Sequence, residues 1–411
     1  MGTDKNGVVV VGAGQAGAEL VAALRMSDYR GPITMIGDEA FPPYYRPPLS
    51  KAYLSGKVDL EGLYIRPVAM YEEQGIAMRV SSRAVAIDRD AHRVLLEDGS
   101  SLGYERLVLA TGGRVRKLQY PGLDAAPNVH YLRTIDDINA MRHRFLPGAR
   151  LVIVGGGYVG LEVASVARKL GLSVTVLEAQ PRVLARVTAP EVSSFYQRIH
   201  AEEGVDVRVD TTVAGFGFAT DGAVTSVELG SGESISADVV LIGIGQVPNV
   251  ELAEAAGLPV DNGIVVDEYC RTADPDILAI GDCTSHPCSE NGGRRRLESA
   301  PNASEQARVA AGALTGALQP YNAIPWFWSD QYDTKLQTVG LSAGYDDVVI
   351  RGETEKGRSF VAFYLKNGEI RAADVVSSPR DFMFAKKLVA QRAKVSRATL
   401  EDLSIPLKQS L

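Results

Sequence analysis

The sequence predicts an α/β protein in which two similar domains, each opening with a βαβ unit, are accompanied by a C-terminal α+β domain. The first observation is a pattern that occurs twice, at 8–20 and at 151–164: an apolar run, a G-x-G-x-x-G turn and a second, apolar-periodic run. The second observation is that residues 328–411 lack this pattern but contain a hairpin and then a helical stretch from about Arg380. A chain of 411 residues also exceeds what one hydrophobic core usually supports.

A β-branched strand that ends in G-x-G-x-x-G and leads into a helix is the opening of a Rossmann unit, which binds a dinucleotide. The first glycine permits the tight turn, the second lets the backbone approach the pyrophosphate, and the third lets the helix pack on the strand. The pyrophosphate then meets free N–H groups at the helix N-terminus. The glycines in these places are Gly12, Gly14 and Gly17 in the first copy and Gly155, Gly157 and Gly160 in the second.

An acid closes the next strand in each copy, as a dinucleotide site requires. The first strand, "ITMIGDE", ends in Asp38 and Glu39, and the second, "VTVLE", ends in Glu178. Such an acid accepts hydrogen bonds from ribose hydroxyls and repels a 2′-phosphate, so the second copy is expected to prefer NADH to NADPH. The alternative for Glu178 is a solvated acid at a strand end.

The repeat continues beyond the two loops. Each copy goes on through a hairpin, the first turning at Asp98-Gly99, to a strand that ends in small residues, "LVLATGG" or "VLIGIGQ". A later strand, "TADPDILAIGDC", delivers Asp282 and could complete the first copy's sheet after the second copy has been inserted. We therefore expect two bound dinucleotides, one for each copy.

Composition excludes several other classes of protein. A formal charge of −7 argues against nucleic acid as the main partner, and no apolar run is long enough to cross a bilayer. The N-terminus has no apolar region typical of a secretory signal. Three scattered cysteines, Cys270, Cys283 and Cys288, form no C-x-x-C pair, which favours a reducing cytoplasm over a disulfide framework. No metal site is expected.

Seven short stretches, in this order, carry a resemblance that covers essentially the whole chain: "RPPLSKAYL", "RLVLATGG", "YLRT", "IGDC", "PNASEQAR", "PWFWSDQY" and "IPLK". The chain resembles the FAD-dependent, NADH-using ferredoxin reductases of bacterial oxygenase systems. The resemblance implies a glutathione-reductase-like fold with FAD in the first copy and NADH in the second. The implied domains are an FAD-binding domain (1–112 and 244–327), an NAD-binding domain (113–243) and a C-terminal interface domain (328–411).

The stretch "FPPYYRPPLSK" contains no cysteine. Disulfide reductases of this shape place a cysteine pair against the flavin here, and the related peroxidases and oxidases use a single cysteine. Electrons therefore cannot pass to a protein thiol at this place and must leave for a diffusible acceptor. The implied reaction is hydride transfer from NADH to FAD, followed by one-electron steps to a [2Fe–2S] ferredoxin. That ferredoxin would feed a haem monooxygenase (cytochrome P-450) or a ring-hydroxylating dioxygenase.

The resemblance also implies three catalytic residues. Lys51 would lie beside the flavin, where a positive charge stabilises its electron-rich reduced form, and Glu162 would face Lys51. Trp328 would lie near the exposed side of the flavin, whereas Trp326 packs in a domain junction. The alternatives are an exposed lysine, an acid favoured by the helix dipole, and two core aromatic residues.

The remaining implied positions hold the cofactors. Asp38 would bind the adenosine ribose and Asp282 a ribityl hydroxyl, while Tyr158 would either gate the nicotinamide pocket or merely cover the turn. Ala84 and Ala300 could contribute only backbone contacts or packing. The other cofactor-binding positions are Ala16, Arg46, Lys51, Ala84, Ala110, Thr111, Gly112, Arg133, Gly245 and Ala300.

Ferredoxins are acidic, so a locally basic docking surface is expected on this acidic chain. Residues 328–411 carry 13 Lys and Arg against 11 Asp and Glu, a net charge of +2, and the remainder carries 30 against 39, a net charge of −9. Six basic residues lie within 380–397, and Arg308 matches a family position near the docking site. The alternative for the basic run is a solvated helix face.

The sequence is also compatible with three competing functions. A rubredoxin reductase has the same architecture, and a flavoprotein of the apoptosis-inducing-factor type would act chiefly as an NADH-responsive interaction protein. Against the second stand the lack of a long insertion, of a basic DNA-binding surface and of an organelle presequence. A direct NADH oxidase or peroxidase is disfavoured because the stretch before Lys51 lacks cysteine.

Overall fold

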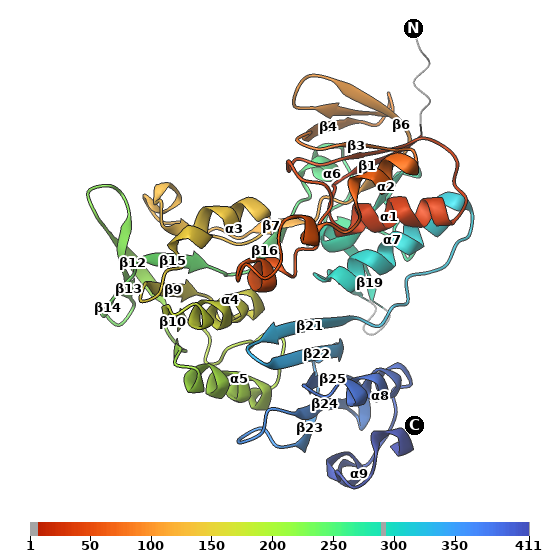
Figure 1. The fold of residues 1–411 in the computed structure, drawn as a ribbon. Helices are drawn as coiled ribbons and strands as arrows, with labels where there is room; N and C mark the ends of the chain where they lie inside the picture. Colours follow the sequence, from red (N-terminus) through yellow and green to blue (C-terminus); the bar gives the residue numbers. More distant parts are fainter. Residues whose placement is uncertain (1–6, 289–292, 411) are drawn as a thin grey trace. The chain divides into compact units, whose positions relative to one another are not determined.

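The computed structural model describes residues 7–288 and 293–410, and the chain divides into two compact units (Figure 1). Each unit is assembled from three separate stretches of the chain. Unit 1 contains Met1–Tyr45, Asp59–Arg114 and Gln246–Pro325, and unit 2 contains Arg46–Val58, Val115–Gly245 and Trp326–Leu411.

The main sheet of unit 1 has seven strands in the order β3-β2-β1-β6-β5-β4, with β18 also paired to β6. Pairing is parallel among β1, β2, β3, β6 and β18, and antiparallel along β4, β5 and β6. The strands are β1 (Gly7–Val11), β2 (Ile33–Ile36), β3 (Ile76–Arg79), β4 (Ala84–Asp88), β5 (Arg93–Leu96), β6 (Ser101–Leu109) and β18 (Ile277–Ala279). The late strand β18 therefore joins the first copy's sheet, as the strand ending in Asp282 led us to expect.

Helices and loops cover both faces of this sheet, which explains why every residue of β1 is apolar and buried. On one face, α1 (Gln15–Met26) lies beside α7 (Ala300–Thr315), and both pack over Val8 and Val10 (Figure 1). On the other face, Val9 and Val11 pack with Ala253 of α6 (Glu251–Ala255). The smaller elements are η2 (Glu61–Leu63), α2 (Val68–Glu73), β16 (Gln246–Pro248), β17 (Ile264–Val265), η5 (Gly281–Cys283), β19 (Thr284–Cys288) and β20 (Gly293–Arg295).

Unit 2 contains a second parallel sheet, with five strands in the order β11-β10-β9-β15-β8. A three-stranded antiparallel sheet, β12-β13-β14, follows in the same stretch of chain. The strands are β8 (Val129–His130), β9 (Arg150–Val154), β10 (Ser173–Leu177), β11 (Asp206–Arg208), β12 (Val213–Phe218), β13 (Val224–Leu229), β14 (Ser234–Ser236) and β15 (Val239–Ile242). The other elements of this part are η3 (Leu123–Ala125), α3 (Ile135–Met141), η4 (Arg142–Arg144), α4 (Tyr158–Lys169) and α5 (Pro190–Glu202). The boundary between the two units falls within the short strand β7 (Gly113–Val115).

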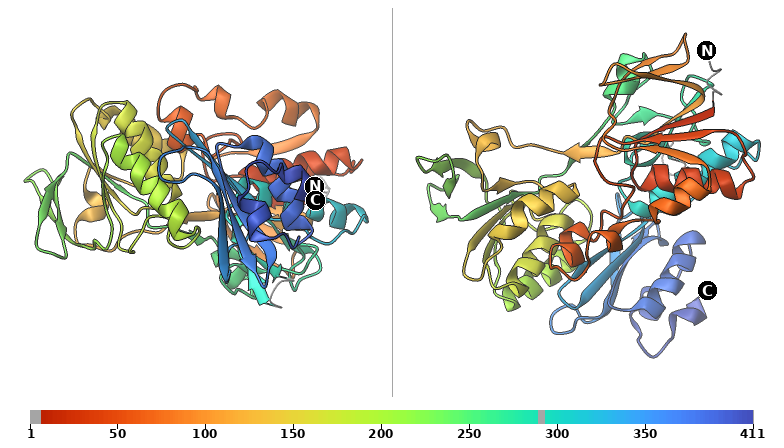
Figure 2. Two further views of the ribbon diagram at one scale, coloured as in Figure 1. Left: turned by 90° about the horizontal axis from the view of Figure 1, so that it is seen from below. Right: turned by 45° about the horizontal axis from the view of Figure 1, so that its top comes forward.

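The C-terminal part of unit 2 is a five-stranded antiparallel sheet in the order β21-β22-β25-β24-β23. Its helices lie on one side of the sheet, with α8 packed on β22 and β25 (Figure 2). The elements are β21 (Trp326–Gln331), β22 (Thr334–Gly340), β23 (Asp347–Gly352), β24 (Phe360–Lys366), β25 (Glu369–Val376), α8 (Pro379–Ala390), α9 (Arg397–Glu401) and η6 (Leu407–Ser410). This sheet and helix pair form the expected α+β segment.

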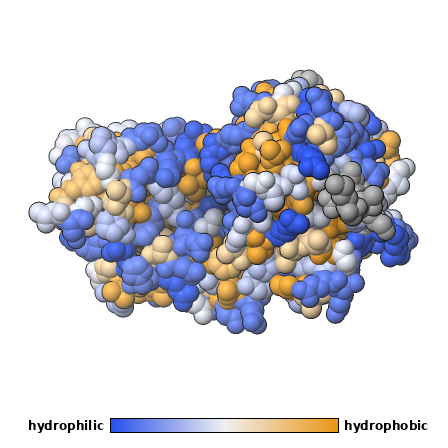
Figure 3. Space-filling model, turned by 90° about the horizontal axis from the view of Figure 1, so that it is seen from above, coloured by the Kyte–Doolittle hydropathy of each residue, from blue (hydrophilic) through white to orange (hydrophobic). Residues whose placement is uncertain are grey.

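A short π-helix, η1 (Leu49–Tyr53), belongs to unit 2 and packs against α4, as does β21. The helix α4 therefore meets two stretches that are distant from it in sequence. No helix among the described residues is long and apolar enough to cross a membrane. Hydrophilic side chains are spread widely over the face that Figure 3 shows.

Candidate active site

The first dinucleotide loop, between β1 and α1, is tightly packed at two of its three glycines. A Cβ atom at Gly12 would lie 2.1 Å from the carbonyl oxygen of Ala110, and one at Gly17 would lie 2.1 Å from that of Gly12. The loop after β9 repeats this arrangement: a Cβ at Gly155 would lie 2.4 Å from the oxygen of Gly243. These glycines are needed for packing within the protein itself.

The middle glycine of each loop has a different environment. A Cβ at Gly14 or Gly157 would meet no atom within 4 Å. The φ angles, −96° and −82°, are ones that any residue adopts. Neither packing nor backbone conformation requires glycine there, so the open space at each loop fits the close approach of a bound pyrophosphate.

The helices that follow the two loops leave their N-terminal N–H groups available. Neither α1 nor α4 has a side-chain cap or an acid in its first turn. In contrast, α3 is closed by a capping box between Thr134 and Asp137. Uncapped helix N-termini behind open glycines are suited to anions, so both loops fit dinucleotides.

The predicted ribose-binding acids lie at the ends of their strands. The Glu178 carboxylate accepts hydrogen bonds from the backbone N–H groups of Gly156, at 2.7 Å, and Gln180, at 2.8 Å. These contacts hold Glu178 against the second glycine loop with a fixed orientation. Asp38, two residues after the end of β2, is exposed.

The turn that carries Asp282 is fixed by α7. The Gln306 side-chain oxygen accepts hydrogen bonds from the Gly281 N–H, at 2.7 Å, and from the Thr284 hydroxyl, at 3.0 Å. A Cβ at Gly281 would lie 3.1 Å from that of Ala16, so this turn lies beside the start of α1. Asp282 accepts a hydrogen bond from Gln246 at 3.3 Å.

Several other predicted contacts in unit 1 have partners within the protein. The Thr111 hydroxyl donates to the Asn249 carbonyl at 2.6 Å, and the Gly112 carbonyl accepts from the Asn249 N–H. Ala110 is buried at the end of β6. Ala84 packs at the edge of the core, and Ala300 begins α7. The single hydroxyl proton of Thr111 is therefore used within unit 1.

Arg46, Arg133 and Gly245 belong to unit 2. Arg46 donates to the Arg133 carbonyl at 2.7 Å, and the Arg133 N–H donates to the Asp137 carboxylate of the α3 cap. Gly245 has a φ of +103°, and its carbonyl accepts from the Arg116 N–H. The structure thus brings Arg46 and Arg133 together, although the two are distant in sequence.

Lys51 and Glu162 form an ion pair inside unit 2. The Lys51 ammonium lies 2.6 Å from Glu162 Oε2, and 3.1 Å from the Pro47 carbonyl. The side chains are 17% and 3% exposed, respectively. Pro48 caps the π-helix that carries Lys51, and its carbonyl accepts the N–H of Lys51. A buried carboxylate requires such partners, because desolvation of an unpaired charge costs several kcal/mol, of the order of 3–5.

Two serines that the sequence did not indicate complete the environment of Glu162. The Ser50 hydroxyl donates to Oε2 at 2.5 Å, and the Ser329 hydroxyl donates to Oε1 at 2.6 Å. Ser50 is the neighbour of Lys51, so the stretch "RPPLSK" offered one signal. Ser329 offered no such signal.

The alternation of β21 separates its aromatic residues. Phe327 lies against Tyr158, with ring centroids 4.7 Å apart, and Ser329 reaches Glu162. Trp326 and Trp328 stack on each other with centroids 5.5 Å apart, and Trp326 also contacts Phe382 of α8. Because neighbouring strand residues face opposite sides, Trp328 lies on the other face of β21 from Ser329.

A second buried acid, Asp374 of β25, lies in the C-terminal sheet. Burial raises its pKa to about 7, although the hydrogen bond from the Tyr364 hydroxyl, at 2.5 Å, acts in the opposite direction. The same hydroxyl accepts the Ala189 N–H at 2.9 Å. The fold therefore binds a proton at Asp374 that the unfolded chain releases, between about pH 4 and pH 7.

We expect Asp374→Asn to remove a loss of stability that the wild type shows as pH rises from about 4 to about 7. The folded-state pKa is raised, so the wild type loses stability as pH rises from about 4 to about 7, whereas the variant does not. Relative to its value below about pH 4, the free energy of unfolding of the variant should gain up to about 4 kcal/mol on that of the wild type by pH 7, because each unit of pKa shift corresponds to about 1.4 kcal/mol. Thermal unfolding at pH 5 and pH 8 measures it.

The control is Asp330→Asn, which removes a 44%-exposed carboxylate on the same sheet and should leave the pH dependence unchanged. Burial lowers the pKa of both His130 and His200 to about 4, which acts in the opposite direction. Both histidines are present in each variant and therefore cancel in the comparison. Equal pH dependence of Asp374→Asn and wild type would contradict the assignment.

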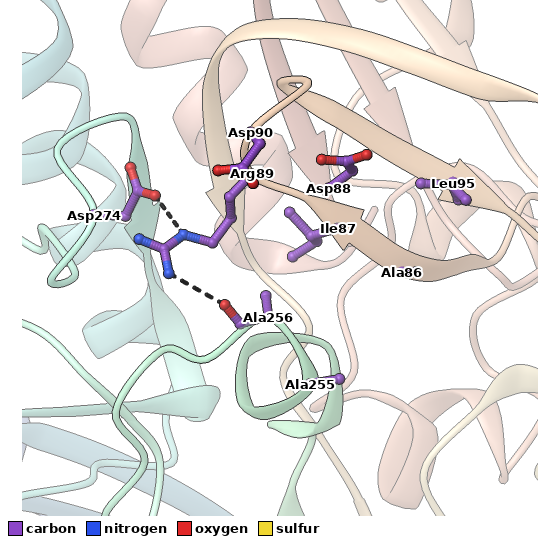
Figure 4. Close-up of a pocket in the computed structure, with 9 residues that line it drawn as sticks. All are labelled: Ala86, Ile87, Asp88, Arg89, Asp90, Leu95, Ala255, Ala256 and Asp274. Atoms are coloured by element: carbon purple, nitrogen blue, oxygen red, sulfur yellow. Dashed lines mark hydrogen bonds and ion pairs between the residues drawn. The ribbon is translucent and has the colours of Figure 1, made fainter.

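A surface hollow of unit 1 contains none of the predicted site residues (Figure 4). Arg89 extends across it and donates to Asp274, at 2.6 Å, and to the Ala256 carbonyl, at 3.2 Å. Its guanidinium is thus engaged by the protein. The lining residues are Ala86, Ile87, Asp88, Arg89, Asp90, Leu95, Ala255, Ala256 and Asp274.

Comparison with known proteins agrees with this geometry. Residues 6–307 match the pyridine nucleotide-disulphide oxidoreductase family, and residues 326–411 match the reductase C-terminal family. The chain therefore belongs to the pyridine nucleotide-disulphide oxidoreductases. It is an FAD-dependent oxidoreductase that uses NADH, which confirms the predicted fold class and cofactors.

Individual relatives cover nearly the whole chain. Putidaredoxin reductase CamA of Pseudomonas putida is 46% identical over 405 residues, which are 98% of this chain and 96% of that protein. The ferredoxin–NAD(+) reductase component of the anthranilate 1,2-dioxygenase system of Burkholderia cepacia is 44% identical, over 98% of each chain. The solved covalent putidaredoxin reductase–putidaredoxin complex matches with a TM-score of 0.96 at 45% identity, covering 99% of this chain and 98% of that one.

Proposed function

We propose that this protein is an NADH:ferredoxin oxidoreductase, which passes electrons from NADH through FAD to a [2Fe–2S] ferredoxin. The ferredoxin in turn supplies a haem monooxygenase (cytochrome P-450) or a ring-hydroxylating dioxygenase. The observation that carries the proposal is the combination of two open dinucleotide loops with a cysteine-free stretch before Lys51. The relatives named as reductase components of ferredoxin and dioxygenase systems support it.

FAD is assigned to the first loop, with Asp38 binding the ribose and Asp282 binding the ribityl chain. NADH is assigned to the second loop, where the fixed Glu178 carboxylate accepts from the ribose and disfavours a 2′-phosphate. The flavin, when bound, supplies the conversion from a two-electron donor to a one-electron acceptor. The chain supplies binding, orientation and the Lys51 charge.

This assignment divides the chain into an FAD-binding domain (1–112 and 244–327), an NAD-binding domain (113–243) and a C-terminal interface domain (328–411). The last boundary is supported by the reductase C-terminal match, which begins at residue 326. We assign the protein to the cytoplasm, where Cys270, Cys283 and Cys288 remain reduced; all three are free thiols.

Two basic features are candidates for contact with an acidic ferredoxin. Arg308, on α7, has a 62%-exposed side chain and pairs with Glu305 at 2.5 Å. The basic C-terminal stretch includes Lys386 of α8, whose ammonium lies 5.2 Å from the ring of Trp326. Its members are Arg380, Lys386, Lys387, Arg392, Lys394 and Arg397.

The test compares acceptors. The purified protein with FAD should reduce ferricyanide with NADH alone, but should reduce cytochrome c rapidly only when a [2Fe–2S] ferredoxin is added. Arg308→Glu should lower the ferredoxin-dependent rate about 10-fold at low salt, because it reverses a charge in an encounter steered by electrostatics. The ferricyanide rate should stay the same.

Three results would contradict the proposal. Ferredoxin-independent reduction of cytochrome c at the full rate would exclude a ferredoxin partner. Activity with rubredoxin but not with ferredoxin would show that the protein is a rubredoxin reductase instead. Rapid NADH-dependent cleavage of a disulfide would restore the chemistry that the cysteine-free stretch excludes.

A further inference from the structure

The hydroxyl of Ser329 is the first link of a chain of polar contacts that leads away from Glu162. Gln331 Nε2 lies 3.2 Å from Ser329 Oγ, and Gln331 Oε1 lies 2.9 Å from His200 Nε2. His200 Nδ1 lies 3.0 Å from the Tyr332 hydroxyl. Ser329, Gln331 and His200 are at most 1% exposed, so water cannot replace these contacts.

The donor of each hydrogen bond in this series can be assigned in turn, starting from the Glu162 carboxylate. Glu162 is paired with Lys51 and accepts from Ser329, so the single hydroxyl proton of Ser329 is used. Ser329 must then accept from the amide nitrogen of Gln331. That orientation leaves Gln331 Oε1 facing His200, so His200 Nε2 must carry the proton.

The last link agrees with this direction. Burial lowers the pKa of His200 to about 4, so its ring is neutral near pH 7 and bears one proton. With that proton on Nε2, Nδ1 is free to accept from the Tyr332 hydroxyl. Burial raises the pKa of Tyr332, so its hydroxyl keeps the proton that it donates. Every donor therefore points toward Glu162.

We propose that Ser329, Gln331 and His200 are positioning residues whose aligned hydrogen bonds hold the Glu162 carboxylate directed at Lys51. Aligned donors polarise one another, and the effect is strong in a buried environment. This series of hydrogen bonds cannot conduct a proton along its length, because the Gln331 amide does not release its hydrogens. Its role is electrostatic, and it rests on the proposed function, in which Lys51 acts on the bound flavin.

Other ionisable groups lie near Glu162. Tyr196 of α5 is fully buried, and both the Glu162 and Asp374 charges raise its pKa further after burial itself. Lys51 is the one ionisable group within hydrogen-bond distance of Glu162 in the contacts described above, and the other partners of Glu162 there are the hydroxyls of Ser50 and Ser329. The groups that face this region are Lys51 of η1, Tyr158 of α4, Tyr196 and His200 of α5, Asp330 of β21 and Asp374 of β25.

The direct test uses histidine NMR of the FAD-loaded protein. The chain has five histidines, and a His200→Asn variant identifies the signals of His200 by their loss. In the ¹⁵N-labelled wild type, His200 should be neutral near pH 7 with the proton on Nε2. A proton on Nδ1 in the wild type would overturn the proposal without the need for any other variant.

Ser329→Ala removes the hydrogen bond that connects Gln331 and His200, through Ser329, to Glu162. We expect a mixture of His200 tautomers, since the direction of the Gln331 amide is no longer fixed. We also expect flavin reduction by NADH to slow by about 10-fold, the scale of one lost hydrogen bond to a charged group. The flavin midpoint potential at pH 7 should shift as well, whereas Ser329→Thr should retain all three wild-type properties.

The matched control is Ser193→Ala, which removes another fully buried hydroxyl of unit 2, one that contacts Arg182 and Val183 rather than Glu162. It should lower stability but leave the His200 tautomer, the rate of flavin reduction and the flavin potential unchanged. Unchanged values in Ser329→Ala would overturn the proposal while leaving the proposed function intact. Failure of the wild type itself to reduce its flavin with NADH would instead remove the proposed function.

Discussion

Replacing Gly157 by valine should raise the KM for NADH about 100-fold, because the pyrophosphate could no longer approach the N–H groups of the loop and each charge-assisted hydrogen bond lost costs about 1.5–3 kcal/mol. The protein should nevertheless fold and keep its FAD. A Cβ at this position meets no protein atom within 4 Å, and the backbone has an ordinary φ of −82°. The added side chain would therefore fill only the space assigned to the pyrophosphate. Ferricyanide reduction as a function of NADH concentration gives the KM, and visible absorbance gives the flavin content.

The matched variant is Gly14→Val, in which the corresponding position of the first loop is filled. This variant should lose its flavin, whereas Gly157→Val should keep it. Gly17→Val is a packing control, because its Cβ would lie 2.1 Å from the Gly12 carbonyl, so unit 1 itself should be disrupted. An unchanged KM in Gly157→Val would mean that NADH binds elsewhere.

Replacing Lys51 by methionine should slow flavin reduction by NADH about 100-fold, the usual scale for removing one preorganised charge from an active site. The same change should destabilise the protein by about 3 kcal/mol, since Glu162 is 3% exposed and would lose its only cationic partner among the contacts described. Stopped-flow bleaching of the flavin and thermal unfolding measure the two effects separately.

The double variant Lys51→Met/Glu162→Gln distinguishes a chemical role from a structural one. Its neutral pair leaves no buried charge, so most of the stability should return, while the slow flavin reduction should persist. If the double variant regained both stability and rate, the Lys51–Glu162 pair would be structural only.

Local patterns in the sequence correctly predicted the elements on either side of the two glycine loops. Each glycine motif lies between a buried strand and a helix. A fold of this kind is predictable because strand, turn and helix are neighbours along the chain. The return of β18 to the first sheet was also predictable, since its strand repeats the pattern of an apolar run closed by an acid.

The surroundings of Glu162 could not be predicted in the same way. Ser329 is separated from Glu162 by 167 residues, and a serine in a strand carries no signal of its partner. Similarly, nothing in the sequence indicated that the Thr111 hydroxyl is used by Asn249. Such contacts depend on which faces of distant elements meet, and that is decided by packing of the whole unit.

The first strand of the C-terminal segment, β21, supplies the Ser329 hydroxyl that donates to Glu162 of α4. This contact restricts where the C-terminal segment can be exchanged with that of a related protein. A chimera that replaces everything after Pro325 with the tail of another reductase would also exchange Ser329 and Gln331. Swaps intended to change only the electron acceptor should therefore keep 326–332 from the recipient, so that the transplanted portion begins at a junction after β21.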